Sequence, residues 1–288
     1  MVWSFKKPDS LPPQQLFLWE SLLDKRTGVQ LSQPQYVLLQ TQVSMRMREL
    51  GIDSYDQYFN YVKDDTTGMA EWQVLVDRLL VKETTFFRHR SSLDLVKNFL
   101  HDRLAINEKK TSGELKDSLE LWSVGCSTGE EPYALAAIAN DCFDERDIPP
   151  YFGVTAVDIS LSALSIARQG VYGRRSVSLL SDAEIKRYLE PYAEDKYQVI
   201  EPIRKRVCFS QLNLLHLKHK PFQPMDVIFC QNVLIYFRRW RRREILNELV
   251  KHLKPVGILV IGLGEVIDWE HPNMQRIDHE ESQAYVKC

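Results

Sequence analysis

The sequence predicts an α/β fold, in which a parallel β-sheet is covered by helices and preceded by an all-α domain. After residue 118, short apolar runs alternate with helical patterns, and this alternation is typical of a parallel sheet with both faces covered. In the first hundred residues, apolar side chains recur at steps of three and four, and no β pattern interrupts them. The length of 288 residues suits about two domains.

The first domain is expected to be helical and to span residues 1–105. Gly51 follows the first apolar stripe as a C-terminal stop, and Ser54 is placed to cap the next helix. Residues 106–118 have no periodic apolar face, so we expect a linker there. The apolar stripes span residues 36–50, 55–62, 69–80 and 93–104.

The second domain is expected over residues 119–288. Helices should begin near residues 130 and 160, and another should cover 239–253. Residues about 176–206 interrupt the alternation, either as a small inserted subdomain or as surface elaboration. The expected strands are 119–124, 154–158, 207–213, 225–232 and 258–264.

Composition and charge exclude several classes of protein. Apolar residues make up 44% of the chain, charged residues make up 26%, and the formal net charge is −2. These values are those of an ordinary globular protein without a broad basic surface, so we expect no nucleic-acid partner. No apolar run approaches the length of a membrane span, and no signal peptide is recognisable, so we expect no membrane insertion.

The cysteines and histidines argue against disulfide bonds and a bound metal. The five cysteines are widely spaced and form no CxxC pair, which favours a reducing, cytoplasmic location. His216 and His219 lie three residues apart without a third apparent ligand. We therefore expect no metal site.

The strongest local motif is GCSTGEEPYALA at residues 125–136, between an expected strand and an expected helix. Gly125 and Gly129 permit a tight turn and a close approach of the backbone to a ligand. Glu130 and Glu131 disfavour a pyrophosphate, and the motif lacks both GxGxxG and GK[ST]. A ligand with a cationic amine suits this loop better. The alternative is a plain strand–turn–helix whose acids favour the helix N-terminus.

Asp158 ends the next expected strand, where an acid can accept hydrogen bonds from both ribose hydroxyls. The alternative is an N-cap for the helix that begins near Ser160. Combined with the glycine loop, ribose binding is the better interpretation. The two motifs together indicate a nucleoside-like cofactor with a cationic amino-acid end, and S-adenosyl-L-methionine fits that description.

The motif QNVLIYF at residues 231–237 follows another expected strand. Gln231 and Asn232 should emerge at the carboxyl edge of the sheet, where such folds bind ligands. Tyr236 is expected near the same mouth. The alternative for Tyr236 is a half-buried packing residue.

Two motifs rich in basic residues remain. In KETTFFRHR, residues 82–90, the two phenylalanines suit a core, and Arg88 is either a solvated charge or a group that can grip a carboxylate. The run RRWRRR, residues 238–243, holds five arginines. Such a run is more often a solvated helix turn than an RNA site.

Taken together, these motifs resemble the chemotaxis-receptor methyltransferases of the CheR type over nearly the whole chain. Their order is TTFFR, WSVGCSTGEEPYALA, AVDIS, QLNLL, DVIFCQNVLIYF and LKPVGILVIGLGE. The resemblance implies a class I, Rossmann-like S-adenosylmethionine-dependent methyltransferase domain with a small antiparallel β insertion. General likeness within the family favours a branch that serves type IV pilus systems over flagellar ones.

The resemblance also implies roles for individual residues. Thr84 and Arg88 should contact the cofactor, Glu131 should hold its amino group, and Asp158 should hold its ribose. Arg88 and Tyr236 are the implied candidates for the transfer step. The residues implied near the adenine are Asn213 and Leu214, and those implied at the methionine end are Gln231 and Asn232.

The chain departs from the family pattern at three places. Lys82 stands where asparagine is common, so this contact is not carried over. Gln231 stands where arginine is common, which leaves a backbone contact as the expectation there. The family's usual HSE after the late strand is here Leu263, Gly264 and Glu265.

The implied activity is methyl transfer to glutamate carboxylates of methyl-accepting chemotaxis receptors, which yields glutamate methyl esters and S-adenosyl-L-homocysteine. Arg46 and Arg48 could steer a glutamate-rich receptor helix; the alternative is that they are solvated surface charges. Two other functions stay open. One is a non-catalytic module that senses S-adenosylmethionine on a receptor array, and the other is an RNA methyltransferase.

Overall fold

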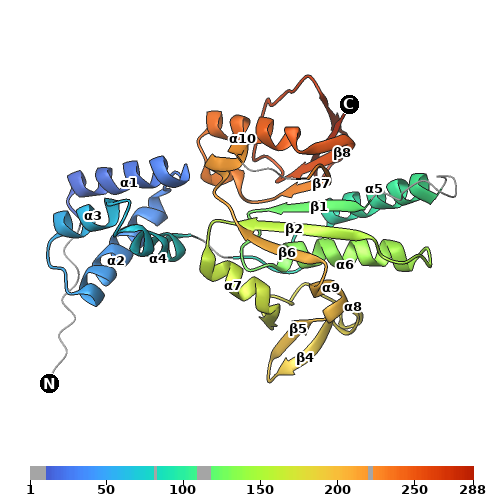
Figure 1. Ribbon diagram of the computed structural model, residues 1–288, viewed down its shortest axis with the longest axis horizontal. Helices are drawn as coiled ribbons and strands as arrows, with labels where there is room; N and C mark the ends of the chain where they lie inside the picture. The colour runs from blue at the N-terminus through green and yellow to red at the C-terminus, as the bar shows by residue number, and fades with distance from the viewer. Residues whose placement is uncertain (1–10, 81–82, 109–117, 220–222) are drawn as a thin grey trace. The chain divides into compact units, whose positions relative to one another are not determined.

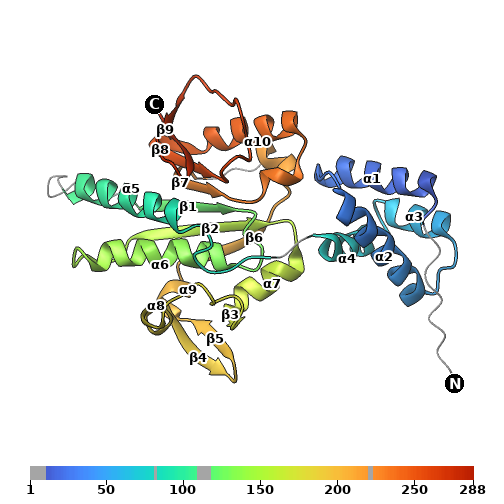
Figure 2. The ribbon, with the colours of Figure 1, turned by 180° about the vertical axis from the view of Figure 1, so that it is seen from behind.

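The computed structural model describes residues 11–80, 83–108, 118–219 and 223–288. Its contacts divide the chain into two units (Figures 1 and 2). Unit 1 comprises the described part of Met1–Val81 together with Tyr236–Arg238. Unit 2 comprises the described parts of Lys82–Ile235 and Arg239–Cys288. Each unit has its own apolar core.

Unit 1 is helical, as the apolar periodicity predicts. Gly51 ends α2 in the left-handed conformation at φ 67°, and the Ser54 hydroxyl accepts a hydrogen bond from Gln57 N at 3.4 Å, so both expected caps are confirmed. Trp19 and Tyr58 are fully buried in the core between the helices. The helices are α1 (Pro13–Thr27), α2 (Gln33–Leu50), α3 (Tyr55–Lys63) and α4 (Met69–Leu79).

An ion pair lies inside unit 1. Arg46 on α2 donates from Nε and Nη2 to the two carboxylate oxygens of Glu71 on α4, at 2.8 and 2.5 Å. The Tyr58 hydroxyl donates to Glu71 Oε1 at 2.6 Å, and Arg46 also pairs with Glu49. The Arg46 side chain is only 14% exposed. Arg46 therefore joins α2 to α4 within unit 1 and is not a solvated surface charge.

Unit 2 contains a seven-stranded sheet in the order β6-β2-β1-β7-β8-β10-β9 (Figure 1). The first five strands in that order are parallel to one another, while β10 runs antiparallel to both β8 and β9. The parallel strands β1 and β7 are almost wholly buried, as is the second half of β8, which is expected for a sheet covered on both faces. The seven strands are β1 (Leu119–Val124), β2 (Phe152–Asp158), β6 (Val207–Gln211), β7 (Met225–Cys230), β8 (Leu253–Ile261), β9 (Met274–Ile277) and β10 (Gln283–Lys287).

The helices of unit 2 pack against this sheet. Helices α5 (Arg90–Glu108) and α6 (Glu130–Asp144) lie side by side (Figure 2), whereas α10 (Arg239–Lys251) packs against β8. Helix α7 (Leu161–Gln169) packs against β2 and β6. The buried face of α5 belongs to the core of unit 2, so the structure places the division of the chain before α5 and not at residue 105. Most of the expected linker, residues 109–117, lies outside the described residues.

A second, three-stranded antiparallel sheet follows α7 in the order β3-β5-β4. It begins at β3 (Val171–Gly173), slightly before the expected insertion, and continues through β4 (Leu189–Ala193) and β5 (Lys196–Val199). The short helices α8 (Asp182–Tyr188) and α9 (Glu201–Arg204) accompany it. The expected small antiparallel insertion is therefore confirmed. The sequence analysis did not foresee β9 and β10, whose short polar-mixed runs carry a weak signal.

Candidate functional site

The polar motifs of unit 2 meet at one edge of the seven-stranded sheet. Strand β1 lies between β2 and β7, and the chain reverses its direction of strand addition at β1. The carboxyl ends of parallel strands flank a crevice at such a reversal, which is the usual ligand site of doubly wound folds. The glycine loop follows directly after β1. Asp158 is the last residue of β2, and Asn232 comes shortly after the end of β7.

The glycine loop, residues 125–129, is held tightly against β2. The backbone N–H groups of Gly125 and Cys126 both donate to the Val157 carbonyl, at 2.8 and 2.9 Å. Gly125 has φ 75° and Gly129 has φ 97°, both in the left-handed region where glycine is favoured. Gly129 is also the N-cap of α6. Both glycines therefore adopt the tight-turn conformation that the motif predicts.

Replacing Gly125 with alanine should weaken cofactor binding by about tenfold or more. A Cβ at this position would lie 2.4 Å from Val233 Cγ2, so the loop and the turn after β7 would have to separate. The φ of 75° adds strain of about 1 kcal/mol for a non-glycine residue. The dissociation constant for S-adenosylmethionine, measured by calorimetry, would test this. Gly51→Ala is the control, because Gly51 has a similar φ of 67° with nothing near its added Cβ. Equal affinity in the two variants would contradict the steric argument.

Asp158 ties the glycine loop to the end of β2. Its Oδ2 accepts a hydrogen bond from Ser127 N, and its Oδ1 accepts one from Ser160 N, both at 2.8 Å. The N-cap of α7 is Ser160 itself, whose hydroxyl accepts from Ala163 N at 3.1 Å. The alternative that Asp158 caps this helix is therefore wrong. Asp158 itself is half-buried, between the glycine loop and the start of α7.

The two glutamates that follow the glycine loop, at the start of α6, have different surroundings. Glu130 is buried and accepts hydrogen bonds from the hydroxyls of Thr128 (2.6 Å) and Ser176 (2.8 Å), so it braces the loop from inside. Glu131 accepts one hydrogen bond, from the Ser123 hydroxyl at 2.6 Å. Burial, reinforced by the neighbouring carboxyl of Glu265, raises the pKa of Glu131 to about 8, while Ser123 and Arg88 oppose the shift. Because burial disfavours the ionised form of Glu131, a cationic ligand beside this carboxyl would stabilise that form strongly.

The segment with Thr84 and Arg88 lies beside the same loop in unit 2. Phe86 N donates to the Ser176 carbonyl at 2.9 Å, and the Phe86 ring meets the Tyr172 ring edge-on at 5.0 Å. The Tyr172 hydroxyl donates in turn to the Thr128 carbonyl at 2.7 Å. Thr84 is half-buried and Arg88 is exposed, with Nη1 donating to the Glu83 carbonyl at 3.0 Å. The Arg88 charge opposes the rise in the pKa of Glu131, so these two predicted residues interact electrostatically.

The end of β7 carries Gln231 and Asn232. Gln231 is 5% exposed, and its Nε2 donates to the Ile261 carbonyl and to Ser92 Oγ, both at 3.1 Å. Its side-chain amide is therefore engaged within the protein. Asn232 adopts φ 58°, and its Oδ1 lies 2.5 Å from Nε2 of His89.

His89 is a residue of this site that the sequence analysis missed. Burial lowers its pKa, the charge of Arg88 acts in the same direction, and the hydrogen bond with Asn232 opposes both. His89 follows Arg88 directly in the chain, but Asn232 is 143 residues away. No spacing rule connects two such positions, so only the fold could reveal the pair.

Asn213, Leu214 and Tyr236 are the remaining predicted residues. Asn213 Oδ1 accepts from Leu215 N at 3.0 Å, and Leu212 N donates to the Asp158 carbonyl at 3.0 Å, which brings this segment to the end of β2. Leu214 begins the 3-10 helix η1 (Leu214–His219). Tyr236 is grouped with unit 1, where its carbonyl accepts from Gln30 N at 2.8 Å. Its place in the transfer step stays a prediction.

Most arginines of the run at residues 238–243 make contacts within the protein. Arg242 donates to the carbonyls of Glu265 (2.6 Å) and Ile235 (3.3 Å), and Arg243 donates to that of Asp268 at 3.2 Å. Arg241 lies over the Trp240 ring at 4.2 Å, and Arg238 pairs with Asp24 at 3.5 Å. These contacts agree with the interpretation of the run as a helix turn, which the sequence favoured over an RNA site.

The described residues contain neither a candidate metal site nor a candidate membrane span. Within the described residues, no group of three or more histidine, cysteine, aspartate or glutamate side chains could hold a metal ion. Of the helices in the described ranges, none combines the length and apolarity needed to cross a membrane.

The donors and acceptors at this edge fit S-adenosylmethionine. Two buried polar atoms here, Ser127 Oγ and Glu265 Oε1, have no hydrogen-bond partner within the described residues. Buried polar atoms normally do have partners, so both positions suit a ligand with polar and cationic groups. A parallel sheet with a terminal antiparallel strand pair, an acidic glycine loop and an acid at the end of β2 together define a class I S-adenosylmethionine-dependent methyltransferase.

The comparisons with known proteins identify the family. The model described as "CheR methyltransferase, SAM binding domain" matches residues 82–284, and "CheR methyltransferase, all-alpha domain" matches residues 15–80. The chain belongs to the CheR methyltransferase family. The predicted resemblance is therefore confirmed, as is S-adenosylmethionine as the cofactor.

Curated relatives match most of the chain. A chemotaxis protein methyltransferase of Borreliella burgdorferi is 33% identical over 83% of this chain and 83% of its own length. The chemotaxis protein methyltransferase of Escherichia coli is 32% identical, over 85% and 81%. A solved magnesium protoporphyrin IX methyltransferase from Synechocystis PCC 6803 is 12% identical, covers 86% of this chain and 97% of its own, and has a TM-score of 0.39. A likeness as weak as this last one assigns no function.

Proposed function

We propose that this protein transfers the methyl group of S-adenosylmethionine to glutamate side chains of methyl-accepting chemotaxis receptors and so forms glutamate methyl esters. The observation that carries the proposal is an acidic glycine loop, joined to Asp158, in a chain of the CheR family. The names of the curated relatives, chemotaxis protein methyltransferases, support a chemoreceptor as substrate. We include a cytoplasmic location in the proposal, which the five free cysteines support.

The proposed cofactor contacts follow the geometry of the edge. Glu131 would hold the amino group and Asp158 the ribose, while the backbone of the glycine loop would pass close to the bound nucleoside. Asn213 and Leu214 would flank the adenine, and Asn232 with the backbone of Gln231 would line the methionine end. Thr84 and Arg88 would close the site from the segment before α5. When bound, the cofactor supplies an electrophilic methyl group on a positively charged sulfur.

The chain's own task in this reaction is to position and desolvate the substrate. A glutamate side chain has an ordinary pKa near 4.3, so it is already ionised at pH 7 and needs no general base. Holding the carboxylate in line with the methyl group can supply roughly 7–11 kcal/mol of the barrier in favourable cases. Excluding water helps further, because water stabilises the separated charges that are neutralised in the transition state. Arg88 is exposed and would orient the carboxylate or the cofactor, and Tyr236 would orient the attacking oxygen.

The test of this function uses methyl-labelled S-adenosylmethionine with receptor-bearing membranes and, separately, total RNA. We expect label on a membrane protein that mild alkali releases as volatile methanol, which is the signature of a carboxyl methyl ester. Alkali-stable label on RNA would overturn the substrate. Cofactor binding without label in either fraction would favour a sensing module.

Substitutions of Arg88 and Tyr236 should reduce turnover more than cofactor binding. We expect Arg88→Ala to lower kcat about 100-fold, because a displaced reactant loses most of the benefit of alignment. Tyr236→Phe keeps the ring and removes only the hydroxyl, so a loss of about tenfold is expected. Initial rates at saturating cofactor, with the dissociation constant measured separately, give both quantities. Arg276→Ala, an exposed arginine on β9, serves as the control. Near-normal kcat in either variant would remove that residue from the transfer step.

A further inference from the structure

Glu265 lies in the loop after β8, where its carboxyl group meets the turn that follows β7. The side chain is 4% exposed, and Oε2 accepts a hydrogen bond from Leu234 N at 3.3 Å. The backbone N–H groups of Asn232 and Val233 also stabilise the ionised carboxyl. Asn232 has φ 58°, so three successive amides curve around one carboxylate, an arrangement that proteins use to hold anions.

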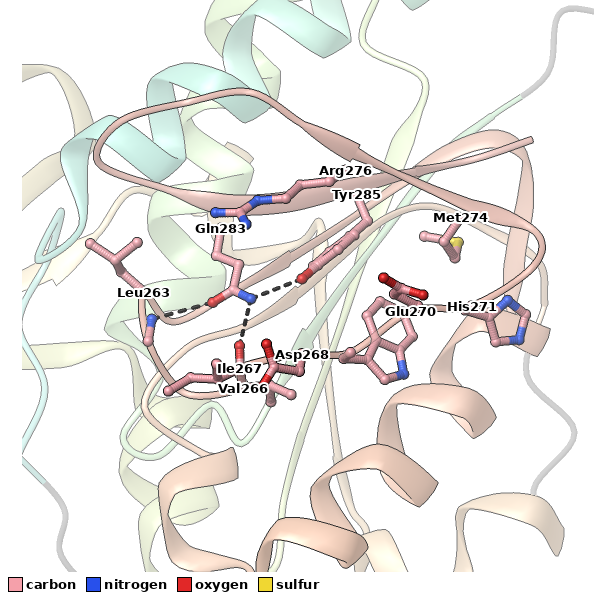
Figure 3. A pocket seen from close by; sticks show the side chains of 12 residues that line it. Leu263, Val266, Ile267, Asp268, Glu270, His271, Met274, Arg276, Gln283 and Tyr285 are labelled. Atoms are coloured by element: carbon pink, nitrogen blue, oxygen red, sulfur yellow. Dashed lines mark hydrogen bonds between the residues drawn. The ribbon is translucent and has the colours of Figure 1, made fainter.

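The backbone on either side of Glu265 is held from β10 and α10. Figure 3 shows Gln283 of β10, which forms hydrogen bonds with the residues before and after Glu265. Its Oε1 accepts from Gly264 N at 3.2 Å, and its Nε2 donates to the Val266 carbonyl at 2.8 Å. Gln283 Nε2 also lies 2.8 Å from the Tyr285 hydroxyl, on the wall of a pocket of about 730 Å³. Arg242 of α10 donates to the Glu265 carbonyl at 2.6 Å. Glu265 therefore has a fixed position.

Residue 262 shows how closely the carboxyl group is packed. A Cβ on Gly262 would lie 2.4 Å from Glu265 Oε1, so the carboxyl occupies space that any other residue at 262 would need. Oε1 itself has no hydrogen-bond partner within the described residues. Oε2 of this buried carboxyl thus accepts from the turn at residues 232–234, while Oε1 is available to a ligand.

The charged and titratable groups around Glu265 come from three elements. Burial raises the pKa of Glu265 to about 7, while the three amides and Arg242 oppose the shift. Glu131 at the start of α6 lies close enough for the Glu265 charge to raise its pKa, and Arg88 acts on Glu131 in the opposite direction. Burial raises the pKa of the Cys230 thiol at the end of β7, and the carboxyls of Glu265 and Glu131 add to this effect.

Building on the proposed function, we propose that Glu265 is a positioning residue of the methyl-transfer site. It fixes the turn at residues 232–234 and forms with Glu131 an acid pair that attracts the cationic cofactor. Two neighbouring acids hold protons more tightly than isolated acids do, because the charge of each disfavours ionisation of the other. A bound sulfonium favours their ionised forms, so cofactor binding should release protons and its affinity should increase from pH 6 to pH 8.5.

The test is a calorimetric titration of the full-length protein with S-adenosylmethionine at pH 6.0, 7.0, 8.0 and 8.5. We expect the affinity of the unmodified protein to rise over this range, and that of Glu265→Gln to rise about tenfold less, because one titrating group is gone. The cofactor's own amino group titrates identically against all variants, so the difference between profiles belongs to the protein. Glu270→Gln, an exposed acid in the same loop, should match the unmodified protein. Parallel profiles for Glu265→Gln and Glu270→Gln would overturn the acid-pair role.

Glu265→Asp separates position from charge. It keeps the carboxylate but shortens the side chain by one methylene, so the amides of the turn lose their acceptor. We expect the pH profile of binding to persist while kcat falls about tenfold. Unchanged kcat together with an unchanged profile would overturn the positioning role. The binding profile requires no receptor, so a failure of the proposed substrate would not be mistaken for a failure of this inference.

Discussion

Replacing Asp158 with alanine is expected to weaken S-adenosylmethionine binding by about 100-fold or more. The carboxylate accepts two backbone hydrogen bonds, from Ser127 N and Ser160 N, and so joins the glycine loop to the start of α7. Hydrogen bonds to a charged group contribute about 1.5–3 kcal/mol each, and 2.7 kcal/mol corresponds to roughly 100-fold in affinity. The loss would include both the loosened loop and the missing acceptor for ribose hydroxyls. Calorimetric dissociation constants measure it directly.

Ser160→Ala is the matched control for Asp158→Ala. It removes the hydroxyl that caps α7 but leaves the backbone N–H that donates to Asp158. We expect a stability loss of about 1 kcal/mol, the usual value of an N-cap, with little change in affinity. Asp158→Asn keeps one acceptor oxygen and should fall between the two. If Asp158→Ala bound the cofactor as tightly as Ser160→Ala, the carboxylate would have no part in the cofactor site.

Arg46→Ala should destabilise unit 1 by about 3 kcal/mol, because the substitution leaves Glu71 buried without its cation. Glu71 is 5% exposed, and both of its oxygens accept from Arg46. Tyr58 would remain as one donor and would keep the loss at the lower end of the range for broken buried pairs. Hydrogen exchange of the α2 and α4 amides in the full-length protein reports on this unit separately from unit 2.

Arg48→Ala provides the comparison on the same helix. Arg48 is exposed on α2, so its removal should change stability by less than about 0.5 kcal/mol. The pair also separates folding from docking. Slower receptor methylation in Arg48→Ala with intact protection of α2 would support electrostatic steering, whereas the same defect in Arg46→Ala would follow from the loosened helices. Unchanged protection in Arg46→Ala would contradict the ion-pair argument.

The periodic parts of the fold could be predicted because burial imposes its period on the sequence. The stripe from Tyr36 to Leu50 appears as α2, and LELWSV appears as β1 with the expected bounds. Helix α5 was equally recognisable, but its apolar face does not reveal which core it joins. An apolar stripe specifies that a face is buried and leaves its partner undetermined. The division of the chain was therefore misplaced.

The candidate site shows a similar limit. Gly125, Gly129, Glu131 and Asp158 stand in local motifs whose residue types already restrict the ligand. The bond of Asp158 to Ser127 N is less accessible to sequence reasoning, because the same carboxylate could equally have capped a helix. Gln231 was placed at the correct edge, but its amide turns inward to Ile261 and Ser92.

The sequence by itself determined the alternation of helices and strands, the acidic glycine loop and the family, since all three depend on residues close together in the chain or on their order. Only the tertiary structure decided which distant groups meet. His89 reaches Asn232 across 143 positions, and Glu265 lies against the 232–234 turn because Gln283 and Arg242 fix its loop. Contacts of this kind arise from the pairing of β7, β8 and β10, and strand pairing brings together segments that carry no mutual signal in the sequence.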